Sequence, residues 1–429
     1  MIELGILADD LTGGMMVASL LEREGVECPL VSSVEALADI PSTATAVVVA
    51  RKIRLVDPVI AVDEAKQTVK ALQKLGCKRF YYKYCATFDS TEKGNIGPIA
   101  EAMLGTLGAS QTLFCPAFPV HTVTVFQGMM FIGSTPLGQS FKQFDPVTPM
   151  LNSNLVDVLQ FQSDSSVGLI SHGLLQRGRE AFESHIAQPS AAKLYIADAA
   201  DDNDLERIAE YTKDWPLTTG ADALPIFLAR AWQAENQVEI KREPRSLLPA
   251  SPGFEAFIAG SCASATLRQI EEFEVRHPVF KIDLLAAEKD PDYVSNILRW
   301  AKRELCNQPV AITSSADAEE LKRSQSALGR EGAADLADRL LGQVAEGLFD
   351  LGVRKFVVAG GETSGQVINA LGIKRVQVSL FDELGGGYCH QGGLEPVSFV
   401  LKAGMLGRPD FCFTAFERMR LAETIDENL

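Results

Sequence analysis

Two neighbouring carboxylates follow the first predicted strand of the chain. Residues 2–8 are mostly apolar, which predicts a buried strand, and Asp9 and Asp10 come directly after it. Open α/β sheets bind ligands at the carboxyl ends of their strands, where an aspartate can orient a hydroxyl group or take its proton. Asp10 could instead be only a turn residue, with Thr12 capping the helix predicted over residues 15–24.

A second polar stretch follows the strand predicted over residues 79–84. This loop is dense in hydroxyl groups, charges and glycine, and a helix is predicted after it, to about Leu107. An anion at the N-terminus of that helix would meet free N–H groups and a lysine. A solvated loop with a Ser or Asn cap is the alternative, but its polar density favours a site. The candidate ligand-binding residues are Lys83, Asp89, Ser90, Lys93 and Asn95.

A glycine-rich turn lies near the C-terminal end, after the strand predicted over residues 356–359. Gly360 and Gly365 have the spacing of a P-loop, but Gln366 and Val367 stand where Lys and Ser/Thr belong. An ordinary P-loop NTPase is therefore disfavoured, and the lack of a G-x-G-x-x-G motif disfavours a dinucleotide enzyme. A strand, such a turn and a helix (predicted over residues 366–371) aim backbone N–H groups at an anion. The alternative is a turn that needs glycine only for its backbone angles.

The elements that position these residues form two α/β patterns. Strands alternate with helices from residue 1 to 236, including a possible strand at 224–228 and a hairpin at 128–136. Residues 237–253 contain three prolines and no sustained periodicity, which predicts a linker. A second pattern covers residues 254–429, with a small-residue turn at 260–266 and a loop at 385–393. The predicted fold class is α/β, with two domains that each hold a mainly parallel sheet flanked by helices.

Composition and charge exclude several classes of protein. The 429 residues are 46% hydrophobic and 22% charged, which is ordinary for a globular protein. A formal net charge of −16 argues against nucleic-acid binding. No apolar run is long enough to span a membrane, and the N-terminus lacks the pattern of a signal peptide. The N-terminus therefore leads us to expect a cytoplasmic chain, in which the eight cysteines would be reduced thiols. They have no C-x-x-C spacing, and no metal ligands are identified.

Taken together, these motifs resemble those of the four-carbon acid sugar kinase family, over nearly the full length. ADDLTGG at 8–14 is similar to the family's A-D-D-x-T-G-A, and YKYCATFDSTEKGNIG at 82–97 to its K-x-x-S-T-F-D-S-T-x-x-G-N-I-G stretch. The latter is the form associated with the 3-oxo-tetronate branch. Shorter matches follow in order: PAFP at 116–119, TPM at 148–150, GSC at 260–262, GGETSG at 360–365 and LKAG at 401–404.

The resemblance implies an N-terminal sugar-acid-binding domain, a C-terminal ATP-binding domain and a cleft between them. It implies phosphorylation of a terminal hydroxyl of a small sugar acid, with ATP and Mg²⁺. Asp9 and Asp10 would be catalytic, and the residues of the 83–95 loop would bind the sugar acid. A homodimer is a further possibility. The nucleotide-binding residues would be Ser261, Gly360, Gly361, Glu362, Thr363, Ser364 and Gly404.

Besides Gly14 for the usual alanine and Ala86 for the first serine, two larger departures from the family pattern leave the substrate open. Residues 120–123 (VHTV) replace the usual Gly-Arg-Thr-Val, so an arginine is missing, and His121 is no convincing base. The loop at 385–393 replaces a short Pro-Gly-Val-Pro segment. The expected substrate is a 3-oxo-tetronate, with a branched oxo-acid such as 3-oxo-isoapionate, or threonate or erythronate, as alternatives. A non-catalytic nucleotide or sugar-acid sensor and an NAD-linked oxidoreductase are the competing classes.

Overall fold

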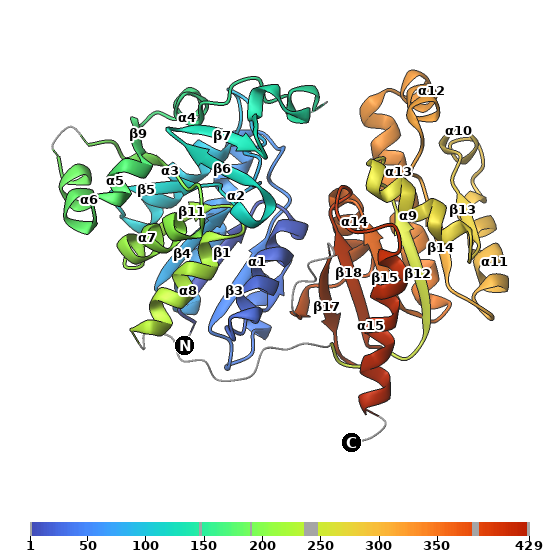
Figure 1. The fold of residues 1–429 in the computed structure, drawn as a ribbon. Coiled ribbons are helices and arrows are strands. Elements are labelled where there is room, and N and C mark those ends of the chain that lie inside the picture. The colour runs from blue at the N-terminus through green and yellow to red at the C-terminus, as the bar shows by residue number, and fades with distance from the viewer. Residues whose placement is uncertain (1, 146–147, 189–190, 236–247, 380–385, 427–429) are drawn as a thin grey trace. The chain divides into compact units, whose positions relative to one another are not determined.

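The computed structural model describes residues 2–145, 148–188, 191–235, 248–379 and 386–426. The chain divides into two compact units, residues 1–243 and 244–429. Helices flank a mainly parallel sheet in each unit, so the predicted fold class is confirmed (Figure 1). Residues 237–247 of the predicted linker lie outside the described residues, and residues 248–253 lie within them.

The main sheet of the first unit is parallel throughout. In spatial order its strands are β2 (Leu30–Val31), β3 (Ala46–Ala50), β1 (Leu4–Ala8), β4 (Arg79–Lys83), β11 (Leu217–Gly220), β5 (Thr112–Cys115), β10 (Leu194–Ala197) and β9 (Val167–Ile170). The chain leaves β1 toward β3 on one side and then returns to place β4 on the other. The carboxyl ends of β1 and β4 therefore mark the point where the strand order reverses, which is where open α/β sheets bind ligands.

Eight α-helices of the first unit surround this sheet in the described residues. They are α1 (Leu11–Arg23), α2 (Pro58–Leu75), α3 (Ile96–Leu107), α4 (Leu155–Gln162), α5 (His172–Gln176), α6 (Arg179–Ile186), α7 (Asp202–Thr212) and α8 (Leu224–Ala234). The short strands β6 (Val123–Phe126), β7 (Met129–Ile132) and β8 (Thr135–Pro136) form a separate antiparallel sheet. Short 3-10 turns lie at Glu35–Asp39, Pro119–His121, Leu137–Gln139 and Phe141–Phe144.

Local sequence explains the limits of these elements. The strands β1 and β3 are buried along their whole length, as expected for apolar runs inside a parallel sheet. Helix α2 begins with the side chain of Asp57 accepting the Val59 N–H, with a proline in its first turn. It ends at Gly76, whose φ of 95° favours glycine.

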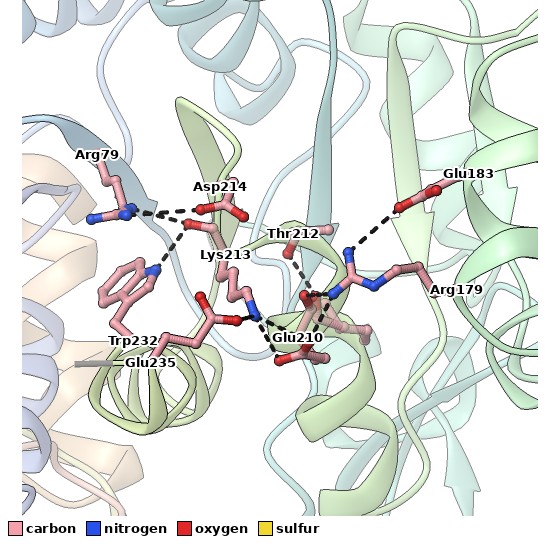
Figure 2. Close-up of polar contacts among 10 residues, drawn as sticks. Arg79, Arg179, Glu183, Glu210, Thr212, Lys213, Asp214, Trp232 and Glu235 are labelled. Atoms are coloured by element: carbon pink, nitrogen blue, oxygen red, sulfur yellow. Dashed lines mark hydrogen bonds and ion pairs between the residues drawn. The ribbon is translucent and has the colours of Figure 1, made fainter. Parts of the chain in front are cut away.

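A polar network braces the amino-terminal end of β4 (Figure 2). The Lys213 carbonyl accepts hydrogen bonds from Arg79 Nε (3.1 Å) and Trp232 Nε1 (2.9 Å). The buried Lys213 ammonium pairs with Glu210 (3.0 Å) and Glu235. Burial opposes the charged form of Lys213, but bonds to Glu235 and Glu210 raise its pKa above the usual value. The network joins α7, α8 and β4 at the end away from the β4 carboxyl terminus, so it is structural.

The sheet of the second unit is parallel except at one end. In spatial order its strands are β13 (Val279–Lys281), β14 (Val310–Thr313), β12 (Phe254–Ala259), β15 (Val353–Ala359), β18 (Val397–Lys402), β17 (Gly387–Gln391) and β16 (Arg375–Val378). The last two pairings are antiparallel. Its described helices are α9 (Ser264–Glu274), α10 (Leu284–Ala287), α11 (Tyr293–Glu304), α12 (Ala318–Leu328), α13 (Arg330–Asp350), α14 (Gly361–Ala370) and α15 (Phe411–Asp426).

Several element predictions were wrong in the first unit. Residues 224–228 begin helix α8 and are not a strand; a short apolar run buried on all sides fits either element. Strand β11, whose sequence is Leu-Thr-Thr-Gly, was missed because it lacks an apolar run. Helix α1 begins at Leu11, earlier than predicted, and its cap is Asp10 rather than Thr12.

Corrections are also needed in the second unit. The loop predicted at 385–393 contains strand β17, which is buried from Gly387 to His390; residue 385 lies outside the described part. Helix α14 begins at Gly361, so residues 362–365 form its first turn rather than a loop before it. Helix α15 was not predicted, although its residues Phe411, Ala415 and Phe416 join the apolar core of this unit.

Candidate functional site

Asp9 and Arg54 form the centre of a charged cluster at the carboxyl edge of the first sheet. Arg54 Nε and Nη2 donate to the two carboxylate oxygens of Asp9, each at 2.8 Å. The Asp9 carbonyl accepts the backbone N–H groups of Ile53 (3.1 Å) and Arg54 (3.2 Å). Asp9 is 2% exposed and the Arg54 side chain 23% exposed. The loop after β3 is therefore held to the end of β1 by both backbone and side chain.

Asp10 uses its carboxylate in two ways. Its Oδ1 accepts the Gly13 N–H at 2.8 Å, which caps α1, and lies 2.9 Å from Arg54 Nη2. The Asp10 side chain is 24% exposed, so Asp10 is much more accessible than Asp9. Burial alone would lower the pKa of Arg54, but the charges of Asp10 and Asp9 outweigh it and hold that pKa well above the usual value. The guanidinium is thus charged and oriented by both aspartates.

Lys83 lies beneath the first turn of α1. Its ammonium donates to the Tyr84 carbonyl at 2.7 Å and lies 3.4 Å from Asp222 Oδ1. A Cβ at Gly13 would be 2.5 Å from Asp10 Oδ1 and 2.7 Å from Lys83 Nζ, so only glycine fits between these groups. Burial disfavours the Lys83 charge, but Asp222, Asp9 and Asp10 raise its pKa overall. Lys83 is therefore a buried cation under the helix cap.

Asn95 ties the Arg54 loop to the start of α3. Its side-chain amide nitrogen donates to the carbonyls of Ile53 (2.7 Å) and Val56 (3.0 Å), and the residue is 3% exposed. Both N–H donors of the amide are thereby used. These contacts hold the loop that carries Arg54, and the role of Asn95 in substrate binding stays a prediction.

Asp89 belongs to a second group in the same loop region. Its Oδ1 accepts from Thr87 Oγ1 (2.6 Å) and lies 2.8 Å from the ammonium of Lys142, and its Oδ2 lies 3.2 Å from the Cys85 thiol. Burial and the Asp89 charge raise the pKa of Cys85 to about 11, while Arg54 and Lys83 lower it. The Cys85 thiol therefore stays neutral, although it lies close enough to Arg54 and Lys83 for their charges to affect its pKa.

The backbone of this loop is strained at Phe88. Phe88 has a φ of 53°, which is uncommon for a residue other than glycine, and its buried ring packs edge-on against Tyr84 with centroids 5.4 Å apart. Ser90, also buried, accepts a hydrogen bond from Gln162 Nε2 at 3.0 Å. Lys93 is exposed, and its N–H donates to Thr91 Oγ1 at 3.3 Å. The structure thus places Lys93 on the surface of the loop, apart from the buried charges.

Strand register explains how these residues meet. Ala8 pairs with Ala50 and with Lys83, and Lys83 pairs with Gly220. The segments that follow β1, β3, β4 and β11 therefore emerge side by side. Sequence reasoning missed Arg54, Asp222 and Lys142. The buried strand at 46–50 was predicted. If it had been paired in parallel with the first strand, Arg54 would have been placed beside Asp9, because both residues follow the carboxyl ends of these strands.

Three small-residue turns meet at the carboxyl edge of the second sheet, after β12, β15 and β18. The Gly260 N–H donates to the Ala359 carbonyl (3.1 Å), and the Gly360 N–H to the Lys402 carbonyl (3.0 Å). A Cβ at Gly260 would lie 2.2 Å from Thr363 Oγ1, and one at Gly404 would lie 2.0 Å from Ser261 Oγ. The turns therefore pack so closely that side chains are excluded at both glycines.

Helix α14 starts within this group of turns. Gly360, with a φ of 121°, precedes it, and its carbonyl accepts the Ser364 N–H (2.9 Å) and hydroxyl (2.7 Å). Gly361 and Glu362 are exposed, whereas Thr363 and Ser364 are buried. The arrangement presents a helix N-terminus and the Ser261 hydroxyl at one sheet edge, a setting suited to phosphate groups.

Comparisons with known proteins identify the family. The family model of a sugar-binding N-terminal domain matches residues 4–227, and that of a nucleotide-binding C-terminal domain matches residues 256–412. A 3-oxo-tetronate kinase of Burkholderia multivorans is 39% identical over 411 residues, 95% of each chain. The chain belongs to the four-carbon acid sugar kinase family. The resemblance and the enzyme class predicted from sequence, a sugar-acid kinase, are confirmed.

Further relatives agree with this family. A 3-oxo-tetronate kinase of Escherichia coli K12 is 34% identical over 379 residues, 87% of this chain and 96% of the relative. A crystal structure of a Salmonella typhimurium LT2 protein shares 30% identity over 97% of this chain and 99% of its own, with a TM-score of 0.83. A Haemophilus influenzae protein shares 27% identity over 97% of this chain and all of its own, with a TM-score of 0.75.

Family membership implies sugar-acid and nucleotide substrates for this chain. No helix in the described residues is long and apolar enough to cross a membrane. The predicted cytoplasmic location and homodimer remain predictions.

Proposed function

We propose that this chain transfers the γ-phosphoryl group of ATP to the terminal hydroxyl of a 3-oxo-tetronate. The observation that carries the proposal is the pairing of Asp9 and Asp10 with Arg54 beside the buried Lys83, at the strand-order reversal of the first sheet. The cluster supplies an accessible carboxylate and a fixed cation within one site. The relatives named 3-oxo-tetronate kinases support this choice of acid.

Arg54 is the residue proposed to hold the substrate carboxylate. Its Nε and Nη2 contact the aspartates, and among the described residues no acceptor engages its Nη1. A planar guanidinium fixed on one side can present its remaining N–H groups to a second carboxylate. In the family pattern an arginine stands within the segment that corresponds to residues 120–123. Arg54 would supply a cation in its place. Lys83 supports Asp10 from below, while Lys93, Asp89 and Ser90 complete the substrate loop.

Asp10 is the proposed general base. Both oxygens of Asp9 are bonded to Arg54, whereas the contacts of Asp10 in the described residues use Oδ1. Oδ2 of Asp10 can therefore accept the proton of the attacking substrate hydroxyl. The hydroxyl oxygen forms its bond to the γ-phosphorus while the bond between that phosphorus and the ADP oxygen breaks. Asp9 would orient Arg54. Most of the catalytic effect then comes from positioning and electrostatics.

The turns of the second unit are proposed to hold the nucleotide. Ser261, Gly360, Gly361, Thr363, Ser364 and Gly404 would bind the phosphate groups through N–H groups and hydroxyls. Mg²⁺ fits this setting, because it takes oxygen ligands mainly from phosphates and water with one or two carboxylates. Glu362, in the first turn of α14, carries a carboxylate at this edge. Bound Mg²⁺ would neutralise charge on the phosphates, in place of a P-loop lysine.

The test is ATP-coupled turnover with Mg²⁺ against 3-oxo-tetronates, 3-oxo-isoapionate, threonate and erythronate. Selective ADP release with a 3-oxo-tetronate is the expected result. Selective turnover of a different acid would replace the proposed substrate. No turnover with any acid, despite calorimetric ATP binding, would favour a non-catalytic sensor.

A matched pair of variants tests the carboxylate contact. Arg54→Met should raise KM for the acid at least tenfold, since a charge-assisted contact is lost. Arg51→Met is the control, because Arg51 lies in the same loop but pairs with Glu64 on α2. Equal KM values for the two variants would contradict the role of Arg54.

A further inference from the structure

One buried lysine of the second unit differs from the other buried lysines of the described residues. Lys402 has no carboxylate within ion-pair distance in the described part of the chain and is fully buried. The others each have at least one: Lys83 with Asp222, Lys142 with Asp89 and Asp145, Lys213 with Glu210 and Glu235, and Lys355 with Glu423. An unpaired buried charge is costly, so its presence calls for a compensating group.

The ammonium of Lys402 is also poorly hydrogen bonded. It lies 3.4 Å from Thr266 Oγ1 and 3.5 Å from the Gly404 carbonyl, both at the outer limit for a hydrogen bond. Burial lowers the pKa of Lys402 to about 8. The neighbouring Cys412 thiol on α15 offers no counter-charge, since burial raises its pKa to about 12. At pH 7 the lysine is therefore mainly a cation with weak contacts.

Lys402 is built into the proposed nucleotide site. Its carbonyl accepts the Gly360 N–H at 3.0 Å, and its ammonium faces the carbonyl of Gly404. Gly404 packs directly on Ser261, as the excluded Cβ shows. Lys402 thus contacts the turn after β15 through its carbonyl and the turn after β18 through its ammonium. It is separated from the turn after β12 only by Gly404, which packs on Ser261. An anion bound on these turns would be the missing counter-charge.

We propose that Lys402 is a positioning residue whose buried positive charge stabilises the phosphate groups of the bound nucleotide from beneath the Gly404 turn. This inference rests on the proposed nucleotide site. The interaction is electrostatic and passes through the turn, so it depends on the number of phosphate charges and not on the base or ribose. It supplies part of the positive charge that a P-loop lysine supplies by direct contact.

The test compares ADP with adenosine in calorimetric titrations of the full chain and of Lys402→Met, which removes the charge and keeps most of the side-chain volume. At pH 7 the variant should lose about tenfold or more in ADP affinity and little in adenosine affinity. Equal losses for both ligands would mean that Lys402 only supports the turn, and would overturn the proposal. Unchanged ADP affinity would overturn it as well.

A control and a second measurement guard against misfolding of the variant. Lys355→Met removes a buried lysine at the start of β15, paired with Glu423, and should leave the ratio of ADP to adenosine affinity unchanged. In the wild type, that ratio should fall between pH 7 and pH 9.5, as Lys402 loses its proton. A ratio independent of pH would contradict the proposal. A wild type that binds no ADP at all would instead refute the nucleotide site itself.

Discussion

Single residues at the first sheet edge differ in how accessible their side chains are, and the proposed roles follow that difference. Asp10 has an accessible carboxylate, whereas Asp9, Lys83 and Asn95 are almost fully buried and hold other groups. The sequence placed all four in the site because they lie in two motifs. It could not separate their roles, since burial depends on neighbours such as Arg54 that lie elsewhere in the chain.

Asp10→Asn should reduce kcat by two orders of magnitude or more, roughly the contribution of a general base. The asparagine oxygen can still accept the Gly13 N–H, so the helix cap and the fold should persist. Asp9→Asn should raise KM for the acid in addition to lowering kcat, because it weakens the hydrogen bonds that orient Arg54. Steady-state kinetics with thermal denaturation of each variant check this prediction. Wild-type kcat for Asp10→Asn would exclude Asp10 as the base.

Lys83→Met should destabilise the first unit by about 3–5 kcal/mol, because it leaves Asp222 buried without its partner. Urea denaturation of the single and double variants with Asp222→Asn measures the effect. The double variant should recover part of the loss. If the two losses simply add, Lys83 and Asp222 are not coupled.

Lys402 predicts an unusual dependence of stability on pH. Its folded-state pKa of about 8 lies below its unfolded value, so the unfolded chain binds more protons between the two. Wild-type stability relative to Lys402→Met should therefore increase between pH 7 and 9.5, by on the order of 2 kcal/mol. The comparison with the variant removes the effects of other titrating groups. A constant difference across this range would show that Lys402 titrates normally.

At the scale of elements, much of the parallel sheet architecture could be predicted from sequence. Apolar runs such as 46–50 and 356–359 predicted strands where the structure has β3 and β15, and Gly360 marked the turn after β15. Elements without such runs failed: β11 has two threonines and a glycine, and β17 is a buried strand with Tyr388 and His390. Because β11 was missed, Asp222, which follows it, could not be placed beside Lys83.

Close packing of the turns after β12 and β18 gives a prediction for Gly404. Gly404→Ala should weaken ADP binding at least tenfold, because its Cβ would lie 2.0 Å from Ser261 Oγ and displace that side chain. Gly332→Ala in α13 is the control, since its Cβ meets only Leu328 at 4.0 Å. The control should bind ADP like the wild type. Calorimetry with both variants tests this, and equal ADP affinities would exclude tight packing at Gly404 as a requirement.

For the whole molecule, the two groups of site residues belong to separate units. Arg54→Met should weaken binding of the sugar acid and leave ADP affinity unchanged, whereas Gly404→Ala should do the reverse. Separate titrations of each ligand into each variant measure this. The net charge of −16 makes such local cations important, because both ligands are anions. A loss of both affinities in either variant would mean that the ligands do not have separate sites.

The position of β11 has a consequence for synthesis on the ribosome. This strand comes near the end of the first unit, yet it inserts between β4 and β5, which are made more than a hundred residues earlier. Until β11 emerges, the edges of β4 and β5 that it will pair with have no hydrogen-bond partner, and Lys83 lacks its ion-pair partner Asp222. The nascent unit is therefore expected to stay incomplete until well past residue 222, a window in which a chaperone would find exposed strand edges.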